Sequence, residues 1–200
     1  MRKILAVGTV GAALLGLAAT ASPASACALV AGVDPCAGTT TVALTSGVVS
    51  GVLSLTATPA ATLTGTSVLA SGPLGLTTVT DLRGDATALT PSSWTYAMKS
   101  TDFTLVGATS PGAGEIISAD KASVYLTTVP LASILGTATY SSFPTTSGGA
   151  TALNADHTAR TIFSAVTHNL NTTTFVPTLQ VDTAGKTAGL YTGTVTQSVS

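Results

Sequence analysis

Residues 92–100 read SSWTYAMKS, and large apolar side chains alternate with small or polar ones along this stretch. The apolar parity holds Trp94, Tyr96 and Met98, and the other parity holds Thr95, Ala97 and Lys99. Successive side chains of an extended strand point to opposite faces of a sheet. The pattern therefore predicts a strand with one face in a core and the other in water.

The same period of two recurs in other parts of the chain, with threonine and serine on the polar parity. The apolar positions are Leu53, Leu55 and Ala57 in one run and Tyr191, Val195 and Val199 in the last. Turn-forming residues separate the runs at 72–73, 83–85, 111–114, 147–149 and 184–186. Many short strands with such turns predict an all-β fold, an antiparallel β-sandwich of Ig-like or Greek-key type, over a single domain at 39–200.

Two runs carry more specific expectations. Phe175, Leu179 and Val181 alternate with Val176, Thr178, Gln180 and Asp182, and Pro177 lies on the same parity as Phe175. Because proline has no N–H for the ladder, we expect that strand at a sheet edge or at a bulge. The last run, Leu190–Ser200, has no terminating charge, and we expect it to offer a free edge for pairing with another chain.

The composition excludes some classes of protein. Apolar residues make up 45% of the chain, charged residues 8%, and the mean hydropathy is +0.53. Disorder needs low hydrophobicity and high charge, so a folded domain is expected. The formal net charge is −1 with only 7 lysines and arginines, which argues against a nucleic-acid partner because phosphates require a basic face.

The first 26 residues have the order of a secretory signal peptide. Arg2 and Lys3 precede an apolar run from Ile4 to Ala19, and Ala24-Ser25-Ala26 follows. The alternative is a membrane anchor, but the run is shorter than the ~20 residues that span a bilayer comfortably. We expect 1–26 to be removed and the protein to be secreted, with no transmembrane segment in the mature chain.

Residues 27–38 form a short segment that contains both cysteines, Cys27 and Cys36. In an exported chain, two cysteines flanking a loop with Gly32 and Pro35 favour a disulfide. Such a short loop would stabilise the fold by about 2–3 kcal/mol at most. The alternative is lipidation of Cys27 as in bacterial lipoproteins, whose usual recognition sequence has leucine where this chain has Ala24.

Several short motifs together resemble a known family. Residues 79–84 read VTDLRG, 93–96 read SWTY, 101–103 read TDF, and 188–196 read AGLYTGTVT. In order and spacing, residues 48–200 resemble the WxL-type cell-surface domains of Gram-positive bacteria. The first Trp-x-Leu position reads Trp94-Thr95-Tyr96, and the second reads Val195-Thr196-Gln197, without tryptophan. The resemblance therefore supports the fold more strongly than the binding activity.

The resemblance implies non-covalent attachment to peptidoglycan, in which the tryptophan motifs are implicated. Trp94 and Tyr96 are accordingly the predicted ligand-binding residues. The competing interpretation of Trp94, favoured by its alternation with Tyr96 and Met98, is a core aromatic packed between two sheets. An exposed indole would instead stack on a sugar ring.

Asp81 and Arg83 lie on one parity of a strand end that runs into a turn, so an ion pair or a turn cap is expected there. An exposed pair of this kind contributes less than about 1 kcal/mol. A calcium site formed by Asp81, Asp85 and Asp102 is a weaker alternative, because calcium needs a higher density of oxygen ligands.

No set of residues for catalysis or for binding a metal or cofactor stands out. His157 and His168 are eleven positions apart and form no zinc motif with the cysteines. Glu115 lies in a glycine-rich loop without an evident carboxylate partner. We therefore predict a secreted, non-catalytic cell-envelope protein that binds peptidoglycan or another wall glycan, or associates with surface proteins. The alternative is a structural or adhesive subunit that self-associates through strand edges.

Overall fold

The computed structural model describes residues 40–46, 48–49, 53–83, 91–132, 137–168 and 171–200. The predicted signal peptide at 1–26, the segment at 27–38 and the predicted Cys27–Cys36 disulfide lie outside these residues. Within them, the helical elements are two 3-10 turns, η1 (Ala119–Lys121) and η2 (Ser147–Gly149). The described part of the chain contains no helix of the length and apolarity that crossing a membrane requires.

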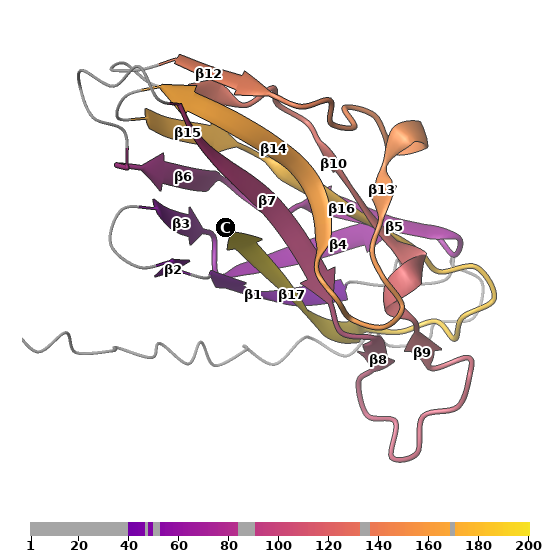
Figure 1. Ribbon diagram of the computed structural model, residues 1–200. Helices are drawn as coiled ribbons and strands as arrows, with labels where there is room; N and C mark the ends of the chain where they lie inside the picture. The colour runs from indigo at the N-terminus through magenta and orange to yellow at the C-terminus, as the bar shows by residue number, and fades with distance from the viewer. Residues whose placement is uncertain (1–39, 47, 50–52, 84–90, 133–136, 169–170) are drawn as a thin grey trace, which may run out of the picture.

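Two sheets make up the fold (Figure 1). The larger sheet has the order β12 (Thr137–Tyr140), β14 (Arg160–His168), β7 (Ser92–Ser100), β17 (Tyr191–Val199), β1 (Thr40–Ser46), β4 (Ala60–Gly65), β5 (Leu69–Pro73), β16 (Pro177–Asp182), β10 (Ala122–Leu126) and β13 (Thr151–Ala152). To it belong β8 (Phe103–Leu105), which pairs with β17, and β9 (Ile116–Ile117), which pairs with β8. The smaller sheet has the order β11 (Leu131–Ala132), β15 (Asn171–Phe175), β6 (Thr77–Asp81), β3 (Leu53–Ala57) and β2 (Val48–Val49). The predicted all-β sandwich is confirmed.

Among the described strands, every pairing is antiparallel except one. The N-terminal strand β1 runs parallel to β17 and antiparallel to β4. It therefore connects the part of the larger sheet that ends on β17 with the part that begins at β4. The expectation of a purely antiparallel sandwich did not include this parallel pair.

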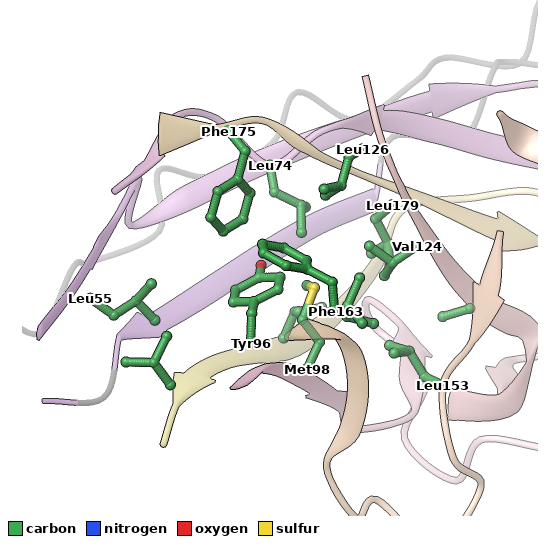
Figure 2. Packing of buried hydrophobic residues seen from close by; sticks show 14 of the residues in the cluster. Leu55, Leu74, Tyr96, Met98, Val124, Leu126, Leu153, Phe163, Phe175 and Leu179 are labelled. Atoms are coloured by element: carbon green, nitrogen blue, oxygen red, sulfur yellow. The ribbon is translucent and has the colours of Figure 1, made fainter. Parts of the chain in front are cut away.

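One hydrophobic cluster lies between the sheets, and the predicted apolar parities supply much of it. Phe163 is at its centre, with ring centroids of Tyr96 at 5.4 Å and of Phe175 at 5.1 Å. Figure 2 shows Phe163 beside Tyr96, with Phe175 reaching them from the smaller sheet. The edge-to-face arrangement of such rings adds to the stabilisation from burial.

The expectation for Pro177 was wrong. The chain passes from the smaller sheet to the larger one at Val176, so the alternating run is two strands, β15 and β16. Pro177 is the first residue of β16, which lies between β5 and β10 inside the larger sheet. A first position tolerates proline, and the alternation continues because both strands face the same core.

The expectation of a free edge at the last strand was also wrong. β17 lies inside the larger sheet, with β7 on one side and β1 on the other. Its neighbours satisfy the backbone groups that an edge strand would present to another chain. The last strand therefore presents no free edge among the described strands.

Candidate functional site

Asp81, the last residue of β6, accepts hydrogen bonds from three side chains and one backbone amide. Its Oδ1 accepts from Arg83 N at 3.1 Å and from Arg83 Nε at 2.9 Å. Its Oδ2 accepts from Arg83 Nη2 at 3.1 Å, from Thr167 Oγ1 at 2.8 Å and from Ser92 Oγ at 3.3 Å. The predicted Asp81–Arg83 ion pair is confirmed.

The pair is not the exposed one that the turn pattern suggested. The Asp81 side chain is 1% exposed and that of Arg83 is 31% exposed. Burial acts to raise the pKa of Asp81, but the hydrogen bonds from Arg83 and Thr167 outweigh it and hold that pKa below its ordinary value. Because Ser92 and Thr167 belong to the larger sheet, the carboxylate links the two sheets. Asp81 and Arg83 therefore have a structural role.

Trp94 and Tyr96 do not fit their predicted role as ligand contacts. Trp94 is 2% exposed and Tyr96 is 0% exposed. The Trp94 ring lies edge-on to Phe163, with centroids 5.6 Å apart. A ring that is enclosed on both faces has no surface on which a sugar could stack. The alternative interpretation of Trp94, a core aromatic between two sheets, is the one that the structure supports.

A buried polar group that the sequence analysis missed lies beside Tyr96. Gln197 is 0% exposed, and its Oε1 accepts from Tyr96 Oη at 2.7 Å and from Thr77 Oγ1 at 3.0 Å. Burial raises the pKa of Tyr96 well above its ordinary value, so the phenol stays a neutral donor. The available signal was parity, because Gln197 shares its face with Val195 and Val199.

The other titratable residues weighed for chemistry have local structural partners. His157, at φ 61°, has Nδ1 2.9 Å from Ser100 O and Nε2 3.9 Å from Asp102 Oδ1. Glu115 Oε2 accepts from Gly112 N at 2.9 Å. Asp85, one of the three residues of the calcium alternative, lies outside the described residues. Within those residues, no three His, Cys, Asp or Glu side chains are grouped as a metal ion would need.

The outer side of the smaller sheet carries an ordered set of hydroxyls. We call it the threonine face, and its members are Ser54 and Thr56 of β3, Thr78 and Thr80 of β6, and Thr172 and Thr174 of β15. The opposite parity of the same strands is buried, except for the partly buried Ala57 at the end of β3. Figure 1 shows β15, β6 and β3 lying next to one another in this sheet.

Strand register arranges the threonine face in two rows. Ser54, Thr80 and Thr172 lie opposite one another, as do Thr56, Thr78 and Thr174. Neighbouring positions in a row are about 4.8 Å apart, and the rows are about 7 Å apart along the strands. These hydroxyls have no hydrogen-bond partner in the described part of the chain, which leaves them available to an external group.

Exposed apolar side chains border the threonine face. They are Leu76 at 57%, Leu82 at 49% and Leu131 at 67% exposure. Leu76 and Leu82 flank β6 on the same parity as Thr78 and Thr80, and Leu131 of β11 lies opposite Thr174. In the described residues of β3, β6, β11 and β15, the one charged side chain is Asp81, on the buried side. The face is therefore uncharged, with hydroxyls in its middle and apolar groups at its margins.

Comparisons with models of known protein families, with curated proteins and with solved structures found no match. The resemblance to WxL-type domains stays a prediction from the motifs.

Proposed function

We propose that this protein is an exported, non-catalytic module of the cell envelope that binds a wall glycan, peptidoglycan or a related polysaccharide, through its threonine face. The observation that carries the proposal is the pair of hydroxyl rows that, within the described part of the chain, have no hydrogen-bond partners and lie on an uncharged sheet surface. The predicted export signal and the resemblance to WxL-type motifs support the same function.

The chemistry of the face fits a polysaccharide. Sugar hydroxyls both donate and accept hydrogen bonds, as the threonine and serine hydroxyls do. Threonine methyls and the exposed leucines offer apolar area for the C–H surfaces of sugar rings. β-Branched threonine is also stiff at χ1, so little side-chain entropy is lost when the face binds.

In this proposal, core side chains on the inner side of the smaller sheet hold the strands of the threonine face in position. Phe175 lies on the inner side of β15, and its ring is 4.8 Å from that of Tyr96. Thr77 on the inner side of β6 donates to Gln197. Both contacts hold face strands against the larger sheet, and rigid strands position binding groups more accurately than loops. Trp94 and Tyr96 would thus affect binding through the position of the face.

The test is co-sedimentation of the purified mature protein with insoluble peptidoglycan. The double variant Thr80→Val and Thr174→Val removes one hydroxyl from each row while keeping a β-branched side chain. Each lost hydrogen bond contributes about 1 kcal/mol, so affinity is expected to fall roughly 10- to 30-fold.

The matched control is Thr194→Val, a partly buried position on the outer side of β17 in the larger sheet. It should bind like the unmodified protein, and far-ultraviolet circular dichroism should show all variants folded. Failure of the unmodified protein to sediment with peptidoglycan would refute wall binding. Equal loss of binding in the control would refute the assignment to the threonine face.

A further inference from the structure

Strand β1 fills a slot inside the larger sheet. All seven of its residues are in register with β17, from Thr40 opposite Tyr191 to Ser46 opposite Gln197. Four of them, Thr40 to Ala43, are also in register with β4. If β1 were withdrawn, the backbone groups that it satisfies on β17 and on β4 would become two unpaired edges inside the sheet.

The connection of β1 to the rest of the sandwich is short in sequence. β1 ends at Ser46 in the larger sheet, and β2 begins at Val48 in the smaller one. β2 itself pairs with β3 through only two residue positions. Residues 47–52 read Gly-Val-Val-Ser-Gly-Val, so two glycines lie between β1 and β3.

The slot itself does not distinguish its own β1 from that of another molecule. β1 contributes no charged residue, since its sequence is TTVALTS. A second copy of the strand would make the same ladder with β17 and β4, and only the direction of the connecting segment would differ. Exchange of an identical element is for this reason a low-cost route to association.

We propose that β1 is exchanged between copies of this protein, so that β1 of one molecule occupies the slot between β17 and β4 of a second molecule. The parallel side of the slot lowers the cost of withdrawing β1, because parallel pairing is slightly less stable per residue than antiparallel pairing. Exchange can close into a dimer or continue from molecule to molecule as a chain.

Exchange involves the last strand in a different way from the free edge that we expected. β17 takes part in association, but as one wall of the slot and not as a free edge. The proposal does not depend on glycan binding, because the slot lies in the larger sheet and the threonine face in the smaller one. Each can fail without the other.

The test uses cysteine pairs in the mature chain, in a Cys27→Ser, Cys36→Ser background that removes the native thiols. The reporting pair is Thr41→Cys with Thr62→Cys, which lie opposite each other on β1 and β4. The control pair is Thr95→Cys with Ser164→Cys on β7 and β14, whose hydroxyls are 3.3 Å apart. Both pairs are oxidised after incubation at low and at high protein concentration.

Exchange predicts covalent dimers or longer chains on non-reducing gels for the reporting pair, increasing with protein concentration, and covalent monomers for the control pair. Light scattering on the unoxidised protein should show the same increase in mass. A strict monomer at every concentration would overturn the proposal. Oligomers in which the reporting pair forms disulfides only within one chain would also overturn it. So would oligomers in which both pairs form disulfides between chains to the same extent, because association would then occur by another route.

Discussion

Thr167 Oγ1 donates a hydrogen bond of 2.8 Å to Asp81 Oδ2, and the two residues belong to different sheets of the sandwich. Thr167 lies on β14 of the larger sheet and Asp81 ends β6 of the smaller one. A carboxylate that is 1% exposed thus connects the two layers at the end of the core where β6 ends.

Replacing the carboxylate should weaken the fold. Asp81→Asn keeps the size of the side chain but removes the charge that Arg83 pairs with, and its amide N–H₂ would face existing donors. Removing one partner of a buried, hydrogen-bonded pair is costly, so we expect the free energy of unfolding to decrease by about 3 kcal/mol. Urea denaturation followed by circular dichroism measures it.

The control for this substitution is Asp120→Asn, at an exposed carboxylate in η1. Surface changes of this kind usually alter stability by less than about 0.5 kcal/mol. Equal stability of Asp81→Asn and Asp120→Asn would contradict the structural role of Asp81.

Stability should also depend on pH through Asp81. Its pKa in the folded protein is lower than its ordinary value, because hydrogen bonds to the charged form outweigh the effect of burial. Such a group stabilises the fold above the unfolded-state pKa, and this contribution is lost as the pH falls through the folded-state pKa. We expect the urea concentration at the unfolding midpoint to decrease as the pH is lowered below about 4. In Asp81→Asn this decrease should be less steep. Parallel pH profiles for the two proteins would contradict this linkage.

The buried amide of Gln197 provides a double-mutant cycle. Tyr96→Phe and Thr77→Val each remove one of two donors to Gln197 Oε1 and should each cost about 1 kcal/mol. The double variant leaves the buried oxygen without a donor, so its loss should exceed the sum of the single losses. Combining Tyr96→Phe with Tyr191→Phe, whose hydroxyl donates to Gly114 O and Thr187 O, should be additive. Additivity in both pairs would mean that Gln197 does not couple Tyr96 to Thr77.

The single tryptophan reports on the location of the binding site. Trp94 is 2% exposed, so its fluorescence should be resistant to quenching by acrylamide in the folded protein and sensitive to it in urea. Addition of soluble peptidoglycan fragments should leave the emission unchanged, because the threonine face lies on the other side of the smaller sheet. A shift in the emission at a saturating concentration of the fragments would indicate that Trp94 contacts the ligand.

The sequence pattern predicted which side chains of a strand face the core. Trp94, Tyr96 and Met98 are all buried, as their alternation indicated. The same rule places Gln197 on the buried face of β17, although its side chain is polar. Pro177 shows the limit of the rule, because two strands of different sheets that face one core continue a single alternation. Nothing in the pattern indicates where the chain changes sheets.

The candidate site was predictable only in its residue types. Threonine on the polar parity of several runs indicated wet faces of strands, but not that three of these strands lie side by side in one sheet. The rows of the threonine face depend on the register of β3, β6 and β15, which are far apart in sequence. The expected ligand contacts at Trp94 and Tyr96 were wrong, because the motif says nothing about which side of the strand a ligand can reach.

The amino-acid sequence by itself determined the all-β class, the inward parity of its strands and the Asp81–Arg83 pair, because each depends on residues within a few positions of one another. The tertiary structure decided the parallel insertion of β1 beside β17, the interior place of the last strand and the burial of Asp81. The physical reason is distance along the chain. Asp81 and Thr167 are 86 positions apart, and such contacts form only when strands from distant parts of the chain pair and pack together.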